Sequence, residues 1–182
     1  MLSFFIRRET GNCFMDMNFY YADEEYIDFL KNAEKAARGY TCVPNISYGN
    51  AAKFTFGAVM FVNGMNYYVP VSSYSKKQED AILIKDKNGT NILGTLRFTY
   101  MIPIPKQCCK KVDINAFHNK KSIAHISKEL AFCRRNRDRI IRQAEKTYKR
   151  VVSKENDRLT KNSCDFKLLE QAYMEFCKTH SL

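Results

Sequence analysis

Residues 54–71 read FTFGAVMFVNGMNYYVPV, and they carry the clearest structural pattern in the chain. Apolar side chains occupy every second position from 54 to 62, which is the period of a β-strand with one buried face. Asn63-Gly64 then supplies the dipeptide most typical of a tight two-residue hairpin turn. The chain therefore returns along its own strand, and the stretch predicts an antiparallel β-hairpin.

Further strand-like runs follow this hairpin. Residues 81–85 read AILIK, residues 86–89 read DKNG and predict a turn, and residues 91–104 read NILGTLRFTYMIPI. The prolines at positions 70, 103 and 105 suit strand ends or a sheet edge, because proline has no amide hydrogen to donate. We therefore expect four or five short antiparallel strands between Lys53 and Ile104, which form a small barrel or a compact, strongly bent β-sheet.

Helical patterns flank this region and make the expected fold class α+β. Residues 23–39 predict a surface helix with Asp23 as its N-cap and Gly39 after its end. Residues 120–154 repeat apolar side chains at helical spacing, and they allow a break near Asn136. The last segment is amphipathic with Asp165 as its N-cap, so the C-terminal part of the chain is expected to be helical.

The length of 182 residues suits a single domain with a substantial core. No linker, internal repeat or low-complexity segment divides the sequence. We expect one domain over residues 17–182 and an N-terminal extension over residues 1–16. No run of 18 apolar residues occurs, and the N-terminus has the reverse of the residue order of a signal peptide. The expectation is a cytoplasmic protein without membrane contact.

The chain is strongly basic, with 30 Lys and Arg against 19 Asp and Glu and a net charge of +11. This balance favours a polyanionic partner, of which nucleic acid is the commonest, although many small basic proteins bind nothing in particular. Seven cysteines occur without a CxxC pair, which indicates neither a zinc site nor a disulfide framework. Reduced thiols in a cytoplasmic protein are the default for such cysteines.

Motifs of the common catalytic classes are missing from the sequence. It contains neither GxGxxG nor GxxxxGK[ST], so no phosphate-binding nucleotide loop is predicted. The three histidines lack metal-ligand spacing, and no acidic pair stands at a strand end as a two-metal nuclease requires. We expect neither a metal nor a cofactor. RNA can still be cut, because its 2′-hydroxyl is a nucleophile that needs only alignment, proton removal and stabilisation of the charged phosphorane.

Hydroxyl and amine side chains suited to this chemistry gather at two places. Residues 72–77 read SSYSKK at a strand end, and residues 46–53 read ISYGNAAK and offer Tyr48 and Lys53. Two alternatives stand beside the catalytic interpretation. A loop rich in serine and lysine is commonly a solvated connection, while Tyr48 can be a core residue and Lys53 an ordinary edge-strand charge.

Five blocks of sequence follow one another in a characteristic order. They read NFYYADEEYIDFLK, YGNAAKFTFGAVMFVNGMNYYVPVSS, LGTLRFTYMIPIP, VDINAFHNKKSIAHISKELAFCRRNRDRI and SCDFKLLEQAYMEF. In this order the chain resembles the ToxN/AbiQ family, the protein toxins of bacterial type III toxin–antitoxin systems. These toxins are endoribonucleases held in check by a small structured RNA. The resemblance covers about Met17 to Phe176.

The resemblance implies a bent antiparallel sheet like that of the Kid and MazF toxins, with helices around it. It implies RNA cleavage without metal, leaving 2′,3′-cyclic phosphate and 5′-hydroxyl ends, often at adenine-rich sites. The family's active-site residues fall on Tyr48 (beside Asn50), Lys53, Ser72 and Ser73. The SSYSKK segment is one residue longer than in relatives, so the second active-site lysine is Lys76 or Lys77, with Lys76 preferred.

The resemblance also gives the positive charge a second task besides binding substrate mRNA. Toxins of this family process their antitoxin RNA from a precursor and are bridged by it into closed protein–RNA assemblies, in which contacts between proteins are minor. The candidate phosphate contacts here are Lys77, Lys110, Lys111, Arg134, Arg135, Arg139 and Arg142. A solvated helix face is the alternative interpretation of these residues.

Two other functions stay open beside an RNA-cutting toxin. A non-catalytic RNA-binding module would keep the basic helices but would not need the serine and lysine cluster at the strand end. A barrel-fold toxin that acts on a protein such as DNA gyrase would need an apolar docking surface at the end of the chain. The end of this chain is an amphipathic helix that the core is expected to cover.

Overall fold

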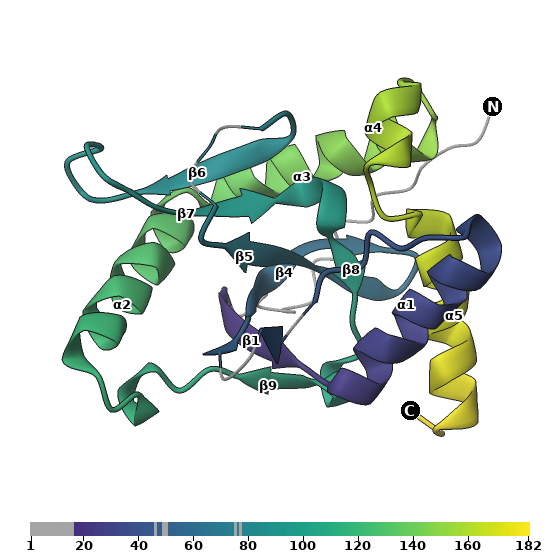
Figure 1. Cartoon of the computed structure of the whole chain (residues 1–182), viewed down its shortest axis with the longest axis horizontal. Helices are drawn as coiled ribbons and strands as arrows, with labels where there is room; N and C mark the ends of the chain where they lie inside the picture. Colours follow the sequence, from purple (N-terminus) through teal and green to yellow (C-terminus); the bar gives the residue numbers. More distant parts are fainter. Residues whose placement is uncertain (1–16, 46, 49–50, 75, 77) are drawn as a thin grey trace.

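The computed structural model describes residues 17–45, 47–48, 51–74, 76 and 78–182 (Figure 1). The expected N-terminal extension, residues 1–16, lies outside the described residues, as do Asn50 and Lys77. None of the described helices is both long and apolar enough to cross a membrane.

The centre of the fold is a seven-stranded antiparallel sheet in the order β6-β7-β5-β4-β1-β9, with β8 paired to β5. Its strands are β1 (Asn18–Ala22), β4 (Thr55–Val62), β5 (Met65–Ser72), β6 (Ala81–Lys85), β7 (Ile92–Arg97), β8 (Ile102–Pro103) and β9 (Cys109–Lys111). A separate pair joins β2 (Ser47–Tyr48) to β3 (Ala51–Ala52). The large sheet ends at β6 and β9, so the described strands form an open sheet and not the closed barrel that was the other expectation.

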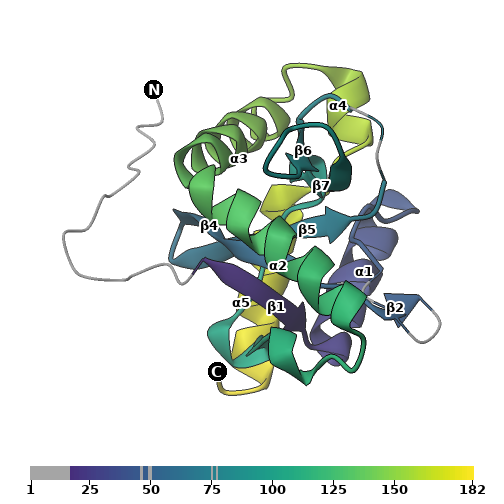
Figure 2. The ribbon, with the colours of Figure 1, turned by 90° about the vertical axis from the view of Figure 1, so that its left-hand side faces the viewer.

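The hairpin read from the sequence is confirmed as β4 and β5. Asn63 and Gly64 both have positive φ, 52° and 81°, which is the backbone of the hairpin turn that this dipeptide favours. The alternation along β4 describes only part of its environment, because every residue from Thr55 to Met60 is buried. Helices cover the sheet: Figure 2 shows α2 (Lys120–Arg135) in front of the strands and α5 (Phe166–Thr179) behind them, and α3 (Arg137–Val152) packs directly against β4.

The helices are α1 (Glu24–Arg38), α2 (Lys120–Arg135), α3 (Arg137–Val152), α4 (Asp157–Lys161) and α5 (Phe166–Thr179). Short 3-10 turns lie at Phe98–Tyr100, Lys106–Cys108 and Ile114–Ala116 and are labelled η1 to η3.

Helix ends follow the capping signals of the sequence. The Asp23 carboxylate accepts a hydrogen bond from Tyr26 N at 3.1 Å, and Gly39 ends α1 with φ of 78°. Asn136 separates α2 from α3, which confirms the break, and its side-chain amide donates to Phe132 O at 2.9 Å.

Five strands occupy the described part of the range from Lys53 to Ile104, as expected. The sheet is wider than the sequence indicated, because β1 and β9 add to the free side of β4 from outside this range. Large aromatic side chains fill the space between the sheet and the helices. The largest of the fully buried ones are Phe19, Tyr26, Phe56, Tyr67, Phe98 and Phe166. The burial of these large apolar side chains stabilises the sheet and the helices, and the sheet positions the strand ends.

Candidate active site

Polar side chains from three neighbouring strands share one face of the sheet. Thr55 lies opposite Pro70, and Ser72 lies opposite Thr95. Residues that face each other across a sheet project to the same side, and so do residues two apart along a strand. The register therefore gathers a set of mostly polar side chains on one face where β4, β5 and β7 meet. The set is Lys53, Thr55, Pro70, Ser72, Thr95 and Arg97.

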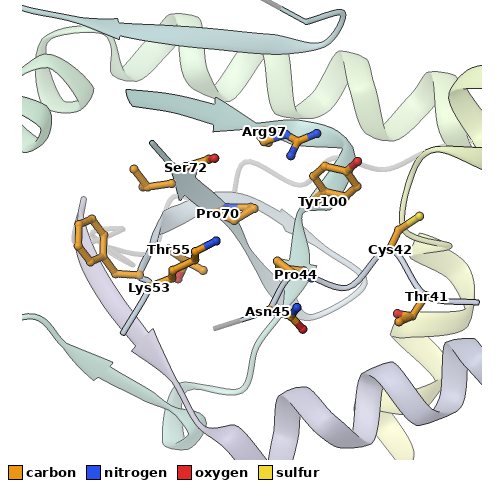
Figure 3. A pocket seen from close by; sticks show the side chains of 12 residues that line it. Thr41, Cys42, Pro44, Asn45, Lys53, Thr55, Pro70, Ser72, Arg97 and Tyr100 are labelled. Atoms are coloured by element: carbon orange, nitrogen blue, oxygen red, sulfur yellow. The ribbon is translucent and has the colours of Figure 1, made fainter. Parts of the chain in front are cut away.

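A pocket of about 290 Å³ opens over this face, and we call it the strand-end pocket. Figure 3 shows Lys53 and Ser72 on one side of Pro70, and Arg97 with Tyr100 on the other. The loop after α1 supplies the facing wall. That wall is made of Thr41, Cys42, Pro44 and Asn45.

The turn after β5 is held by two hydrogen bonds. Tyr74 N donates to Ser72 Oγ at 3.2 Å, and the Tyr74 carbonyl accepts from the hydroxyl of Thr95, a fully buried residue. Ser72 Oγ accepts from the backbone here, and a hydroxyl that accepts still has its own hydrogen to donate. The turn thus fixes Ser72 at the border of the strand-end pocket.

Of the residues predicted to be catalytic, Lys53 and Ser72 both line this pocket and are half-buried. Ser73 and Lys76 are exposed neighbours that are not among its lining residues. Tyr48 lies in β2, where its backbone pairs with Ala51 just ahead of Lys53. Lys77 lies outside the described residues, so the choice between Lys76 and Lys77 stays a prediction.

Apart from Lys77, which is outside the described residues, the basic residues predicted to bind RNA are not among those that line the pocket. Lys110 and Lys111 are exposed on the edge strand β9. The predicted RNA-binding residues of α2 and α3 are also exposed: Arg134, Arg135, Arg139 and Arg142. Arg134 also has a structural contact, since its guanidinium donates to Met17 O at 3.1 Å and to Asn18 Oδ1 at 2.5 Å. This arginine therefore helps to anchor β1.

Arg97 and Tyr100 are pocket residues that the sequence interpretation missed. The η1 turn has three residues per turn, so side chains three apart stack, and the Arg97 guanidinium lies 4.2 Å from the centre of the Tyr100 ring. Arg97 Nε is buried and has no hydrogen-bond partner among the described residues. Leaving a buried donor in this state typically costs about 1–3 kcal/mol. The available signal was an arginine at the end of the strand ILGTLR, two positions after a threonine on the same face.

The opposite wall of the pocket is held by a buried carboxylate. Glu34 is fully buried, and its Oε2 accepts hydrogen bonds from Thr41 Oγ1 at 2.7 Å and from Cys42 N at 2.6 Å. Its Oε1 pairs with Arg38 at 2.7 Å. Burial, with a smaller effect from the Glu34 carboxylate, raises the pKa of the Cys42 thiol. Cys42 is therefore a neutral wall residue at neutral pH and a poor nucleophile.

Helix α2 approaches the back of the site at Gly94 of β7. A Cβ at this position would lie 2.5 Å from Glu129 Oε1 and 3.1 Å from Ser72 O, so a larger residue would fit only if the Glu129 side chain moved. Burial raises the pKa of Glu129 to about 7. The half-exposed His125 faces this carboxylate, with 3.5 Å between Nε2 and Oε1.

The lining of the strand-end pocket suits an anion. It contains the ammonium group of Lys53, the guanidinium of Arg97 and the hydroxyl of Ser72, and none of the described residues that line it is Asp or Glu. Hard metal ions prefer carboxylate oxygens, whereas phosphate oxygens prefer such cationic and hydroxyl donors. Within the described ranges, no group of three or more His, Cys, Asp or Glu is placed to hold a metal ion.

Comparison with known proteins gives consistent matches over nearly the whole chain. Endoribonuclease AbiQ of Lactococcus lactis subsp. lactis is 28% identical over 168 residues, covering 86% of this chain and 87% of AbiQ. Endoribonuclease ToxN of Pectobacterium atrosepticum is 29% identical over 173 residues, covering 89% and 95% of the two chains.

Solved structures agree with these sequence matches. A toxin of a bacterial type III system, described with its selective inhibition by a non-coding RNA pseudoknot, superposes with a TM-score of 0.77 at 27% identity. The match covers 87% of this chain and 96% of that chain. AbiQ, described as a lactococcal anti-phage endoribonuclease, gives a TM-score of 0.77 at 26% identity and covers 89% and 98%.

The family described as "Toxin ToxN, type III toxin-antitoxin system" matches residues 18–174, which confirms the resemblance read from the five sequence blocks. With this match spanning most of its length, the chain belongs to the ToxN family of toxins.

Proposed function

We propose that this protein is a metal-independent endoribonuclease toxin, inhibited by a small structured antitoxin RNA. The observation that carries the proposal is the convergence of Lys53, just ahead of β4, and Ser72, the last residue of β5, in a pocket whose described lining residues include no carboxylate. Relatives named endoribonucleases support the reaction class. Residues 17–182 would form the single domain that carries this activity.

The proposed reaction is a transesterification within the RNA strand. The 2′ oxygen attacks the adjacent phosphorus and loses its proton, while the bond from phosphorus to the 5′ oxygen breaks and that oxygen gains a proton. The products carry a 2′,3′-cyclic phosphate and a 5′-hydroxyl. Lys53 and Lys76 would bind the scissile phosphate, and Ser73, beside Ser72, would orient the attacking hydroxyl. Tyr48 would belong to the same site, as the family resemblance implies.

The antitoxin RNA would occupy the basic surfaces outside the pocket. The exposed lysines of β9 and the exposed arginines of α2 and α3 suit phosphate contacts. One solved relative is inhibited by an RNA pseudoknot, and another is described with a processed non-coding RNA that regulates an antiviral system. We expect this protein to process its antitoxin precursor with the same pocket. Its antitoxin binding should weaken steeply as salt rises, and salt-independent binding would contradict phosphate-dominated contacts.

The test of the proposed function is cleavage of RNA by the purified protein in excess EDTA. We expect cleavage to persist and the fragments to carry 2′,3′-cyclic phosphate and 5′-hydroxyl ends. Binding without cleavage would instead indicate a non-catalytic RNA-binding module. Toxicity without cleavage or RNA binding would indicate a protein target such as DNA gyrase.

The two serines can be separated in the same assay. The Ser73→Ala variant is expected to lose cleavage and toxicity while it still binds RNA, as the family resemblance implies. Ser72→Ala should lose cleavage as well, because Ser72 Oγ lines the pocket and accepts from Tyr74 N. Full cleavage by either variant would remove that serine from the proposed site.

A further inference from the structure

Arg97 stands out in the strand-end pocket because its guanidinium is held in place and its buried Nε has no acceptor among the described residues. It is the last residue of β7, and its two chain neighbours, Leu96 and Phe98, are fully buried in the core. Buried neighbours on both sides fix the backbone from which the side chain projects. The guanidinium therefore has a defined position before any ligand binds.

Tyr100 fixes the orientation of this guanidinium. The guanidinium carbon of Arg97 lies 4.2 Å from the centre of the Tyr100 ring, which is a stacking distance. Stacking engages the face of the guanidinium and leaves its N–H groups to donate in the plane. Nε is the donor that remains buried and without a partner among the described residues.

The surroundings indicate what those donors would bind. Arg97 shares the pocket with Lys53 and Ser72, and the lining residues within the described ranges include no carboxylate that could neutralise a guanidinium. An arginine presents two parallel N–H groups that match two oxygens of one phosphate group. A bound phosphate would therefore pair with N–H groups of this guanidinium and balance the charge of the pocket.

We infer that Arg97 binds two non-bridging oxygens of the scissile phosphate and stabilises the phosphorane formed during cleavage. The inference rests on the proposed ribonuclease function. When the 2′ oxygen bonds to phosphorus, the phosphorane gains negative charge on these oxygens before the bond to the 5′ oxygen breaks. Arg97 is then a catalytic residue, and Tyr100 is a positioning residue that holds its plane.

The substitution Arg97→Lys tests this role because it keeps the charge and removes the planar pair of donors. Single-turnover cleavage should fall about 100- to 1000-fold, the loss typical of removing one donor to a developing oxyanion. Affinity for an uncleavable RNA with a 2′-deoxy nucleotide at the cut site should change by less than about tenfold. The matched control is Arg158→Lys, which changes an exposed arginine on α4 and should leave both values unchanged.

Tyr100 gives a second test with a conservative rescue. Tyr100→Phe keeps the ring and should cleave nearly as fast as the wild type, whereas Tyr100→Ala should lower kcat and leave KM nearly unchanged. Equal cleavage by both variants would exclude the positioning role of the ring.

A measurement on the wild type guards against a variant that fails to fold. The Arg97 Nε–H resonance, assigned by its loss in the Arg97→Lys spectrum or by its proximity to the Tyr100 ring, should shift when the 2′-deoxy RNA binds. An unchanged resonance would overturn the inference. So would Arg97→Lys cleavage within about threefold of wild type, or equal losses in cleavage and in binding of the uncleavable RNA. If the wild type itself fails to cut in EDTA, the proposed function fails, which is a different result from an active Arg97→Lys variant.

Discussion

Arg38 and Arg97 are two arginines stacked on tyrosines near opposite walls of one pocket, and they differ in what their N–H groups meet. The Arg38 guanidinium lies 4.4 Å from the Tyr40 ring and donates to Glu34 Oε1 at 2.7 Å and to Ser163 O at 2.8 Å. Arg97 lies 4.2 Å from the Tyr100 ring, with Nε buried and lacking a described partner. The first arginine is paired with protein acceptors, whereas the described residues offer none to the Nε of the second.

The positive charges of a basic protein thus fall into those that protein groups already pair with and those that a ligand can reach. Arg150 belongs with Arg38, because it pairs with Asp80 at 2.7 Å and with Glu79 at 2.8 Å. Arg134 belongs there in part, through its contacts with the start of β1. A net charge of +11 therefore overstates the charge available to RNA, since part of it holds helices and strands together.

The largest expected loss of stability comes from removing the carboxylate that pairs with Arg38. Glu34→Ala should lower the free energy of unfolding by about 3–5 kcal/mol, because it leaves Arg38 without its carboxylate partner in a mostly buried site. It also removes the acceptor for Thr41 and Cys42, so the pocket wall should loosen. Urea unfolding measures the loss.

The matched control for this substitution is Glu175→Ala, which removes an exposed carboxylate from α5. Its unfolding free energy should stay within about 0.5 kcal/mol of wild type. A Glu34→Ala loss as small as that of Glu175→Ala would show that the Arg38 cluster does not hold the pocket wall.

Local signals explain which parts of the fold were predictable. The Asn63-Gly64 turn, the Asp23 cap and the break at Asn136 each depend on a few adjacent residues, and each is confirmed. The addition of β9 to β1 depends on pairing between residues about 90 positions apart, for which the short CKK strand carries no pattern. The burial of both faces of β4 likewise depends on helices that come much later in the chain.

The same limit applies to the site. Lys53 and Ser72 were predicted from their amine and hydroxyl side chains and from the family resemblance, and the structure brings both to the pocket. Arg97 was missed because its place beside Ser72 is set by the register in which Ser72 faces Thr95. The sequence of residues 91–104 does not predict that register, so it does not show which side chains Arg97 would lie beside.

Glu34 and Glu129 are two buried carboxylates that face different partners. Glu34 is buried with Arg38, whereas Glu129 is buried facing the half-exposed His125, and burial raises its pKa from 4.5 to about 7. Below pH 4.5 both folded and unfolded chains hold the proton. Between pH 4.5 and 7 only the folded chain holds it, so stability from this group is lost as pH rises and the loss is complete above pH 7.

Glu129→Gln should remove this pH dependence. The variant should gain up to about 3 kcal/mol relative to the wild type between pH 4.5 and pH 8, since each pKa unit corresponds to about 1.4 kcal/mol. Urea unfolding at several pH values gives the two curves. Parallel curves across this range would contradict a protonated Glu129 in the folded protein.

Removing the Thr95 hydroxyl should have the smallest effect on stability, and it tests whether the turn after β5 serves the fold alone or also the site. Thr95→Val removes the hydroxyl that donates to Tyr74 O and should cost about 1 kcal/mol of unfolding free energy. Thr90→Val is the matched control, because it removes a hydrogen bond of similar size to Asp86 in the turn between β6 and β7. Only Thr95→Val should also slow RNA cleavage, by up to about 100-fold, because the Tyr74 carbonyl anchors the turn that fixes Ser72. Equal cleavage by the two variants would mean that this turn contributes to the fold alone and that Ser72 keeps its position without it.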